Sequence, residues 1–559
     1  MAHPMITASL LGCTVLIGTS LTACGGGQVD NAKVVESTSP SEPTVKTLSL
    51  TSGYDEALYA AVGAAHADQV LAAADVTVPT ETATGEAPAG ADPAAPELAN
   101  PDVPTMKAQA VRTESSSLAA VTTANPNPLT SVERIEQIAG DGSSLPQPIS
   151  NHWGLHQTRI TTHSDGTIRA LYLRSVNTTT LQWRLMKRNK ATGAWSQEAL
   201  GLSSDDVTLS RDPVSDVAHV LAWPSSIPTV YTSPGYSAKP VPGTWQVLPG
   251  TSRHYGNSGI GDDGTFCLKV SIETATSTPT TNTKMQIACG QHSVVTGKWA
   301  WQPPRQQDIN LRRTYDYLFP GGAGVASGLI GTSQLDLYKT AAGLGALAPS
   351  EGNYVMNGVS FYSTPIDTTS TMQLTDIVRP YVVTSNSQIA PVARQWDAFV
   401  DRKSRLLVSY YVNDPLNSAA RGTYLSVNDT VGRTLFQGRL TALPAYGYAR
   451  VFDDAKGRLW LLWTNLGSQS TQVVIYRIQE QGGNFQLSDK TDLSARFAPY
   501  AIQGSPYLAV PRGGQRVGTT LDGVMIACDG QFQNAQLADC SPTGANKQRI
   551  VHFRLRLPD

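Results

Sequence analysis

The chain has few glutamates in the part where a fold is expected. Residues 150–559 contain four of them, each in or beside a predicted loop or outer strand: Glu198, Glu273, Glu351 and Glu480. This scarcity argues against a glycosidase that works with a pair of glutamates, although aspartates could substitute. The chain also lacks a Gly-x-x-x-x-Gly-Lys phosphate loop, a Gly-x-Ser-x-Gly elbow and a His-Glu-x-x-His zinc helix. The enzyme classes that those patterns mark, with their cofactors, are therefore not expected.

No stretch near the N-terminus is long enough to span a membrane comfortably. The apolar stretch 6–21 is interrupted by Thr14, Gly18 and Thr19, whereas a membrane-spanning helix needs about 20 predominantly apolar residues. We therefore expect a cleaved export signal. A basic residue usually opens such a signal, and here only His3 precedes the stretch. An ordinary secretory signal is thus the alternative to a lipid-anchored one.

The apolar stretch ends at residues 21–24, Leu-Thr-Ala-Cys, which three glycines follow. This pattern resembles the lipobox of bacterial lipoproteins. The resemblance implies that residues 1–23 are a signal peptide and that Cys24 is diacylated and becomes the N-terminus. It also implies a protein held by its lipid on the bacterial envelope. Gly25 stands where many inner-membrane lipoproteins have aspartate, which favours the outer membrane, on its periplasmic face or at the cell surface.

Cysteine is scarce, and its placement agrees with export. Outside the predicted signal and anchor, four cysteines remain. Cys267 begins one strand-like segment and Cys289 ends the next, so a hairpin folded about its midpoint sets their sulfurs opposite each other. Cys528 and Cys540 flank another short polar loop in the same manner. Two local disulfides are expected in an oxidising compartment. His292 lies three residues after Cys289, but no second such pair stands near the other cysteines, so a metal site is not predicted.

The segment 24–130 lacks tryptophan and is rich in Ala, Thr, Pro, Ser and Glu. This composition cannot bury a core and predicts a linker, in which 54–75 could form a short alanine-rich helix. Residues 1–130 hold 4 Lys+Arg and 13 Asp+Glu, whereas residues 131–559 hold 38 and 31. The basic body favours an anionic partner. It has no Lys/Arg-rich run, so nucleic acid is not an expected partner.

A repeat of short strands runs through residues 131–559. Gly-x-Trp occurs at 193–195, 243–245 and 297–299, at spacings of 50 and 54 residues. Between copies a turn leads into an apolar strand, as at 262–270. Periods of about 40 to 50 residues built from short strands are typical of propeller blades. The sequence therefore predicts an all-β fold, a β-propeller of about seven blades, with six or eight as the alternatives.

The end of the chain alternates between apolar and polar residues. A strand with one apolar and one wet face is expected at the outer edge of a blade, so this stretch predicts an outermost strand. The apolar members are Val551, Phe553, Leu555 and Leu557, and the polar members are His552, Arg554 and Arg556.

The order strand, turn, strand, Gly-x-Trp resembles that of sialidase-type (BNR-like) β-propellers. Residues 158–160, Thr-Arg-Ile, before Asp165 and Gly166 resemble the opening of the sialidase barrel, and 242–249 is similar to a kelch repeat. The resemblance implies a propeller. A sialidase would also need three arginines for a carboxylate, a tyrosine with a glutamate partner and an aspartate acid/base. The aspartate box of sialidases is degraded throughout, and glutamates are few, so typical sialidase activity is not expected.

Polar and aromatic residues precede the apolar strands, where the innermost strand of each blade should line the central channel. Rings there could stack on sugar faces, and cations could bind carboxylate or sulfate. The alternative is that single members, such as His254 and Tyr255, pack between blades and satisfy one another. The candidate ligand-binding residues are His156, Arg159, Arg253, His254, Tyr255, Asn257, Trp396, Asp397, Tyr446, Tyr448 and Arg450.

Together these features predict an envelope lipoprotein that binds a carbohydrate, above all an anionic one, at the mouth of its channel. As an enzyme it would be a polysaccharide lyase, with arginine neutralising a uronate and tyrosine or histidine removing the α proton, or a glycoside hydrolase. The alternative is a non-enzymatic scaffold for an envelope protein, or an adhesin. The expected partners are thus the membrane, through Cys24, and a polysaccharide or an envelope protein.

Overall fold

The structure of the protein is a computed structural model. It describes residues 130–139, 149–150, 156–175, 181–204, 207–243, 245, 252–273, 283–309, 312–321, 328–338, 354–365, 373–378, 392–413, 417–444, 447–465, 472–529 and 548–558. Cys24, the predicted signal and the predicted helix over 54–75 lie outside the described residues, as does nearly all of the predicted linker. Within the described part, no helix is long and apolar enough to cross a membrane.

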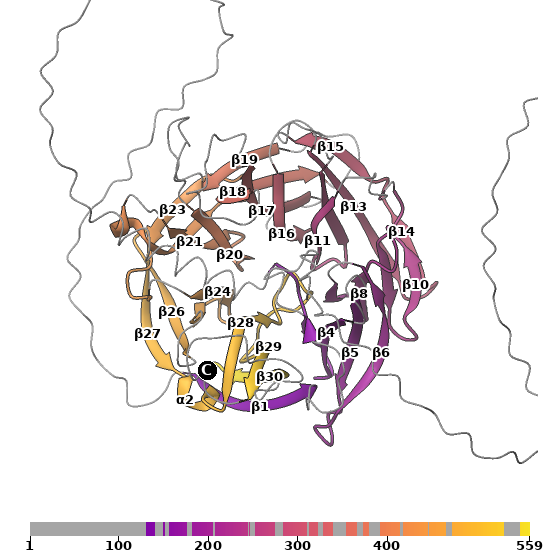
Figure 1. Ribbon diagram of the computed structural model, residues 1–559, viewed down its shortest axis with the longest axis horizontal. Coiled ribbons are helices and arrows are strands. Elements are labelled where there is room, and N and C mark those ends of the chain that lie inside the picture. Colours follow the sequence, from indigo (N-terminus) through magenta and orange to yellow (C-terminus); the bar gives the residue numbers. More distant parts are fainter. Residues whose placement is uncertain are drawn as a thin grey trace, which may run out of the picture. The chain divides into compact units, whose positions relative to one another are not determined.

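The described strands form seven antiparallel blades around a central channel (Figure 1), which confirms the predicted all-β propeller. We use "channel" for the region that the innermost strands line, which side chains fill. Blade 1 holds β2 (Ile149–Ser150), β3 (Ile160–Thr162), β4 (Ile168–Ser175), β5 (Leu181–Arg188) and β6 (Trp195–Ser203). Blade 2 holds β7 (Thr208–Arg211), β8 (Ala218–Ala222), β9 (Thr229–Thr232) and β10 (Ser237–Pro240). Blade 3 holds β11 (Ser252–Ile260), β12 (Phe266–Glu273), β13 (Thr283–Ser293), β14 (Lys298–Trp301) and β15 (Arg305–Ile309).

Blades 4 and 5 are joined by one parallel bridge, between Asn357 and Ala393. Blade 4 holds β16 (Arg312–Pro320), β17 (Gly328–Tyr338), β18 (Tyr354–Pro365) and β19 (Gln373–Val378). Blade 5 holds β20 (Val392–Val400), β21 (Leu406–Asn413), the 3₁₀ turn η1 (Ser418–Ala420), β22 (Gly422–Asn428) and β23 (Thr434–Arg439). Blade 6 holds β24 (Tyr448–Asp453), β25 (Leu459–Thr464), β26 (Val473–Gln481) and β27 (Asn484–Asp492), after which comes the short helix α2 (Ser494–Phe497). Blade 7 holds β28 (Tyr500–Leu508), β29 (Thr520–Asp529), β30 (Gln548–Arg556) and β1 (Ser131–Ala139).

The seventh blade is completed by the first strand of the chain. β1 pairs with β30, from Ser131 opposite Arg556 to Ala139 opposite Ile550, and Figure 1 shows the indigo strand beside the yellow one. The prediction that the last strand is outermost is therefore wrong, because β30 lies between β29 and β1. On its polar face Arg556 stays exposed, whereas His552 is fully buried and lies 2.9 Å from Glu136 of β1.

Apolar side chains between neighbouring blades form the core. Every residue of β25 is buried, as expected for a strand covered on both faces. One core cluster joins blades 5 and 6 and includes Leu425 and Leu461. A second joins blades 6 and 7 and includes Trp460 and Phe553. Contacts between blades thus hold each sheet in place and fix where the innermost strands lie.

Tight turns connect the innermost strands to their neighbours, on what we call the strand-end side of the channel. In these turns Gly166, Gly264 and Gly457 have φ angles of 82°, 79° and 72°, a conformation that glycine adopts at little cost. The Asp263 carboxylate accepts hydrogen bonds from the backbone N–H and the hydroxyl of Thr265, at 2.9 and 2.8 Å. The aspartates of the repeats therefore serve as turn residues.

The predicted disulfide of blade 3 is present. Cys267 on β12 stands opposite Cys289 on β13 in the strand register, and their sulfurs are bonded, with the Cα atoms 4.1 Å apart. Cys528 lies on β29, whereas Cys540 lies outside the described residues. The second predicted disulfide therefore stays a prediction.

Candidate binding site in the central channel

Irregular pairing in the innermost strands shapes the channel wall. The register shifts between His254 and Asn257 in β11, between Thr314 and Tyr317 in β16, between Gln395 and Asp397 in β20, and between Gln503 and Tyr507 in β28. A β-bulge redirects the side chains around it and is common beside functional sites. In these strands the irregularities lie next to the polar side chains that fill the channel.

Six charged side chains and one histidine, each at most 2% exposed, lie together in the described part of the channel wall. We call them the channel cluster. Its members are His156, Arg159, Lys269, Asp316, Asp397, Arg450 and Arg512. Cations outnumber carboxylates among them, which makes this part of the channel electropositive.

His156 lies in blade 1 between β2 and β3 and is fully buried. Its backbone carbonyl accepts hydrogen bonds from Asn257 Nδ2 at 2.7 Å and from Arg512 Nε at 3.2 Å. Neither ring nitrogen has a hydrogen-bond partner in the described structure. Burial, reinforced by Arg512 and Arg159, holds the pKa of His156 well below its ordinary value. The imidazole is therefore neutral at pH 7, with one nitrogen able to accept a proton.

Two tyrosines of β16 stand beside this imidazole. The ring centroids of His156 and Tyr315 are 5.4 Å apart at an interplanar angle of 81°, and Tyr317 lies 6.4 Å away. Tyr315 has a φ of 51°, and such strain in a residue other than glycine is concentrated at functional positions. The Tyr317 hydroxyl donates to the Trp396 carbonyl at 2.7 Å. Tyr315, which is half-buried, is thus the tyrosine next to His156 that reaches toward solvent.

Asp397 on β20 anchors two arginines in the channel wall. Its Oδ1 lies 3.2 Å from Arg512 Nη1 and 3.5 Å from Arg450 Nη1, while its Oδ2 accepts the backbone N–H of Val451 at 3.0 Å. Arg512 Cζ is also 4.8 Å from the centroid of the Tyr317 ring. The Asp397 carboxylate and the Tyr317 ring hold the Arg512 guanidinium close to His156, where its positive charge lowers the pKa of the imidazole.

A second buried pair joins blades 3 and 4. Lys269 Nζ lies 2.6 Å from Asp316 Oδ2 and donates to Ser271 Oγ at 2.7 Å. The Ser333 hydroxyl donates to the other oxygen of Asp316. Burial raises the pKa of Asp316, and Lys269 opposes that rise. In the described part of the chain, no three His, Cys, Asp or Glu side chains cluster in the way a metal ion requires.

The segment that carries Arg512 ties the blades together on the strand-end side. We call residues 509–517, which follow β28, the crossing segment. The N–H of Ile260 in blade 3 donates to the Arg512 carbonyl at 3.0 Å, and the N–H of Arg211 in blade 2 donates to Gly513 at 2.8 Å. Arg402 of blade 5 donates to the Val517 carbonyl at 3.2 Å. This segment therefore runs from blade 7 across the end of the channel.

The structure brings together part of the predicted site. His156, Arg159, Asn257, Asp397 and Arg450 all lie in the channel wall and are at most 1% exposed. They are thus buried inside the wall rather than set at a solvated mouth. Their role in binding a ligand stays a prediction.

Of the other predicted residues, two belong to the core between blades, and the side chains of the rest lie outside the described part of the structure. Trp396 and Tyr448 pack edge to face, with centroids 4.8 Å apart, in the core between blades 5 and 6. Arg253, His254 and Tyr255 lie on β11, and their side chains are outside the described part. Tyr446 lies outside the described residues.

Sequence reasoning missed Lys269, Asp316, Arg512 and the two tyrosines of β16. Lys269 carried a usable signal, because it is the one charged residue inside the apolar stretch 266–272. Arg512 carried none, since it contacts Asp397 across 115 positions of sequence.

Comparisons with known proteins give structural likeness alone. No protein-family model matches the chain, and no curated protein matches it. Solved structures that it resembles include a PL25 ulvan lyase, with 11% identity, a TM-score of 0.42, and 74% of this chain and 95% of that one covered. An α-L-arabinanase of Penicillium chrysogenum is 9% identical, with a TM-score of 0.36, and the match covers 77% of this chain and 98% of that one. A subtype N11 neuraminidase-like protein from a flat-faced bat isolate is 11% identical, with a TM-score of 0.35, and the match covers 76% of this chain and 94% of that one. At identities and TM-scores this low, what those proteins cleave is not transferred to this chain.

Proposed function

We propose that this propeller binds an acidic polysaccharide in its channel and cleaves it by β-elimination. One observation carries the proposal. His156 is a buried, neutral imidazole with no partner on either ring nitrogen among the described residues, next to Tyr315 and within electrostatic range of four cations. Among the described histidines, His156 alone has both ring nitrogens buried without a partner, and a catalytic or ligand-binding role is one explanation for such a group.

The chemistry follows from these groups. Guanidinium and ammonium groups near the carboxylate of a uronate stabilise the negative charge that develops when its α proton leaves. Because His156 is fully buried in this structure, the side chains around it must move apart when the polysaccharide binds. His156 then takes that proton, and the C–H electron pair forms a carbon–carbon double bond as the adjacent bond to the glycosidic oxygen breaks. The Tyr315 hydroxyl donates a proton to the leaving oxygen. The products are a new chain end and an unsaturated uronate.

The test is a cleavage assay of the purified protein on a panel of uronate-containing polysaccharides at two salt concentrations, followed by the ultraviolet absorbance of the new double bond. We expect a salt-sensitive signal, lost in His156→Asn and kept in His219→Asn. His219 is the matched control because it is also buried but lies on β8, away from the channel cluster. Equal activity of the two variants would remove His156 from the mechanism, and silence on every polysaccharide would overturn the proposal.

We also propose that the protein is exported and held on the envelope by a lipid on Cys24. The lipobox-like residues 21–24 support the anchor. The disulfide between Cys267 and Cys289 supports export, because such bonds persist mainly in oxidising compartments.

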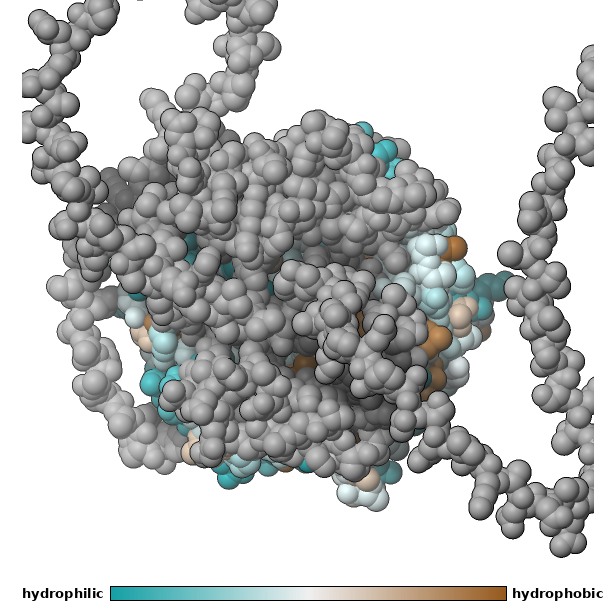
Figure 2. All heavy atoms as spheres, viewed as in Figure 1, coloured by the Kyte–Doolittle hydropathy of each residue, from teal (hydrophilic) through white to brown (hydrophobic). Residues whose placement is uncertain are grey.

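A non-enzymatic scaffold is the second candidate, and it rests on apolar exposure in blade 1. Leu200 and Leu202 on the edge strand β6 are 50% and 49% exposed. On the face shown in Figure 2, however, the brown residues at the periphery are mixed with white and teal ones. Scattered apolar residues are normal on a soluble protein, so binding in the channel is the better-supported function.

A further inference from the structure

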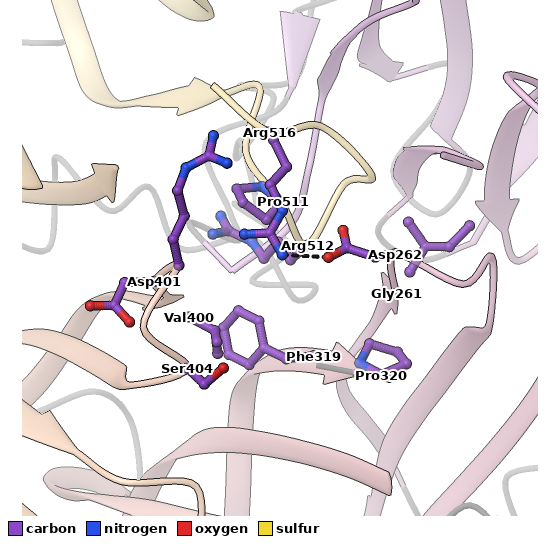
Figure 3. Close-up of a pocket in the computed structure, with 12 residues that line it drawn as sticks. Gly261, Asp262, Phe319, Pro320, Val400, Asp401, Ser404, Pro511, Arg512 and Arg516 are labelled. Carbon is purple, nitrogen blue, oxygen red and sulfur yellow. Dashed lines mark hydrogen bonds and ion pairs between the residues drawn. The ribbon is translucent and has the colours of Figure 1, made fainter. Parts of the chain in front are cut away.

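A cavity lies on the strand-end side of the channel, between blades 3, 4 and 5 and the crossing segment (Figure 3). Its wall includes the last residues of three innermost strands, Ile260, Pro320 and Val400, together with Arg402, Arg512 and Arg516. Its volume is about 250 Å³. Pockets for drug-sized ligands hold roughly 300–1,000 Å³, so this cavity suits a smaller molecule.

The arginines of this cavity retain donors that a ligand could use. Arg516, 38% exposed, donates from Nη2 to Asp262, which is itself 57% exposed, as the dashed line in Figure 3 shows. No other hydrogen bond of Arg516 occurs within the described structure. Arg402, 34% exposed, donates from Nε and Nη2 to the carbonyls of Asp454 and Val517, and its Nε lies 3.6 Å from the buried carboxylate of Asp453. These contacts fix the Arg402 guanidinium, whereas Arg516 is held by Asp262 alone among the described residues, and both retain N–H groups without a described partner.

The cavity also contains two carboxylates, Asp401 and Asp262, which differ in how far they neutralise the positive charge of the arginines. Asp401 is saturated, because Arg405 Nε and Nη2 donate to its Oδ2 at 2.9 and 2.8 Å, and the N–H groups of Lys403 and Arg405 donate to its Oδ1. Asp262 has only Arg516 among the described residues, in a pair exposed to water. An exposed pair of this kind contributes little free energy, so an anionic ligand can displace Asp262 from Arg516.

The opposite wall is apolar. Phe319 is 5% and Val400 8% exposed, and Figure 3 shows both side chains below the arginines, with Pro320 beside them. Ser404 completes this wall; its φ of 60° belongs to the β20–β21 turn, at the position that Gly457 holds in the β24–β25 turn. Two arginines above an apolar wall favour a molecule that has an anionic group on a compact ring.

We propose that this cavity is a second binding site, for a small organic oxyanion such as a single-ring carboxylate or sulfate ester. The anionic group binds Arg516 and Arg402, and the ring packs on Phe319 and Val400. This site goes beyond the function proposed for the channel, because it uses none of the unpartnered nitrogens of His156, although Arg512 both lines it and belongs to the channel cluster.

The test is calorimetric titration of the purified protein with D-glucuronate and, separately, inorganic sulfate. We expect glucuronate to bind and Arg516→Gln to weaken it about tenfold or more, because a charge-assisted hydrogen bond is lost. Arg556→Gln is the matched control, since Arg556 forms a similar exposed pair with Glu133 on the outer strands. Asp262→Asn should tighten binding, because it removes the competitor of the ligand.

Each other result decides against the proposal. If Arg516→Gln binds as the unchanged protein does, or if Asp262→Asn weakens binding, the cavity is not the site. If His156→Asn abolishes glucuronate binding while Arg516→Gln does not, the ligand binds the channel instead, and the function proposed for the channel survives alone. If sulfate binds as tightly as glucuronate, the apolar wall plays no part.

Discussion

Asp397 is the residue on which the buried arginines of the channel depend. It lies within 3.2 Å of Arg512 and 3.5 Å of Arg450, and all three side chains are at most 2% exposed. Breaking a buried pair by removing one partner costs about 3–5 kcal/mol, because the remaining charge is left uncompensated in a low dielectric.

We therefore predict that Asp397→Asn lowers the free energy of unfolding by about 3–5 kcal/mol, as measured by urea denaturation. Asp308→Asn is the control, since Asp308 is 84% exposed and pairs with Lys284 at 3.7 Å; surface pairs of this kind contribute about 0–1 kcal/mol. Equal losses in the two variants would show that burial of the cluster has no energetic consequence.

The depressed pKa of His156 sets the pH dependence of the proposed cleavage. Burial and the neighbouring cations hold this pKa well below the ordinary histidine value of 6.5, so the imidazole keeps its neutral, basic form as the pH falls through that value. We predict that kcat/KM for polysaccharide cleavage stays level across pH 6.5 and declines only at lower pH. A decline centred at pH 6.5 would mean that the base is a histidine of ordinary pKa.

The sequence predicts those site residues that belong to a local pattern, and it does not predict those placed by contacts between distant positions of the chain. His156, Arg159, Asn257, Asp397 and Arg450 were found because each precedes or begins an apolar strand, which is a local pattern. Trp396 follows the same pattern yet belongs to the core between blades, because the bulge in β20 decides which side chains face the channel. No local pattern could report Arg512, whose position depends on the crossing segment.

At the scale of elements, the ring closes through a hydrogen-bonded triad of Glu136, His552 and Asp522, which lie on β1, β30 and β29. His552 Nδ1 lies 2.9 Å from Glu136 and its Nε2 lies 2.9 Å from Asp522. Hydrogen bonds from His552 and Arg188 outweigh burial and lower the pKa of Glu136 from 4.5 to about 2. A carboxylate with a lowered pKa stabilises the fold above its unfolded pKa, and this contribution is lost as the pH falls toward the folded value.

We predict that Glu136→Gln lowers the urea midpoint at pH 7 and that its difference from the unchanged protein disappears as the pH falls from 4.5 toward 2. The control is Glu133→Gln on the same strand, whose carboxylate pairs with a 64% exposed Arg556 and should matter little at any pH. A pH-independent difference for Glu136→Gln would contradict an ionic role in closure.

The place of β30 in its blade shows what local alternation leaves open. The alternation correctly marked one apolar face, since Val551, Phe553 and Leu555 are buried. It could not show that residues 131–139, more than 400 positions away, would pair with the edge of β30 and place Glu136 against His552. The disulfide between Cys267 and Cys289 was predictable for the opposite reason, because a single hairpin brings the two cysteines together.

At the scale of the whole molecule, the repeat length was enough to predict the architecture. Blades of similar length recur because each buries its faces against its neighbours, and the apolar strands and turn glycines carry that repeat. The repeat does not predict the ligand, because the repeated residues pack between blades or form turns and do not line the channel.

The full chain also tests the proposed anchor. We predict that the protein expressed in a bacterium incorporates labelled fatty acid and sediments with membranes, because an acyl chain supplies about 0.8 kcal/mol per buried CH₂. Cys24→Ser should abolish both properties without changing the unfolding of the propeller, and Cys13→Ser should change neither. Labelled, membrane-bound protein in the Cys24→Ser variant would contradict the anchor.

The most direct test of the central claim compares one uronate polysaccharide with its carboxyl-reduced form. Elimination needs the carboxylate, both to acidify the α proton and to engage the cations around His156. We predict that the purified protein releases unsaturated ends from the native polymer and none from the reduced one. Cleavage of both polymers at equal rates would contradict an acidic-polysaccharide lyase built on the channel cluster.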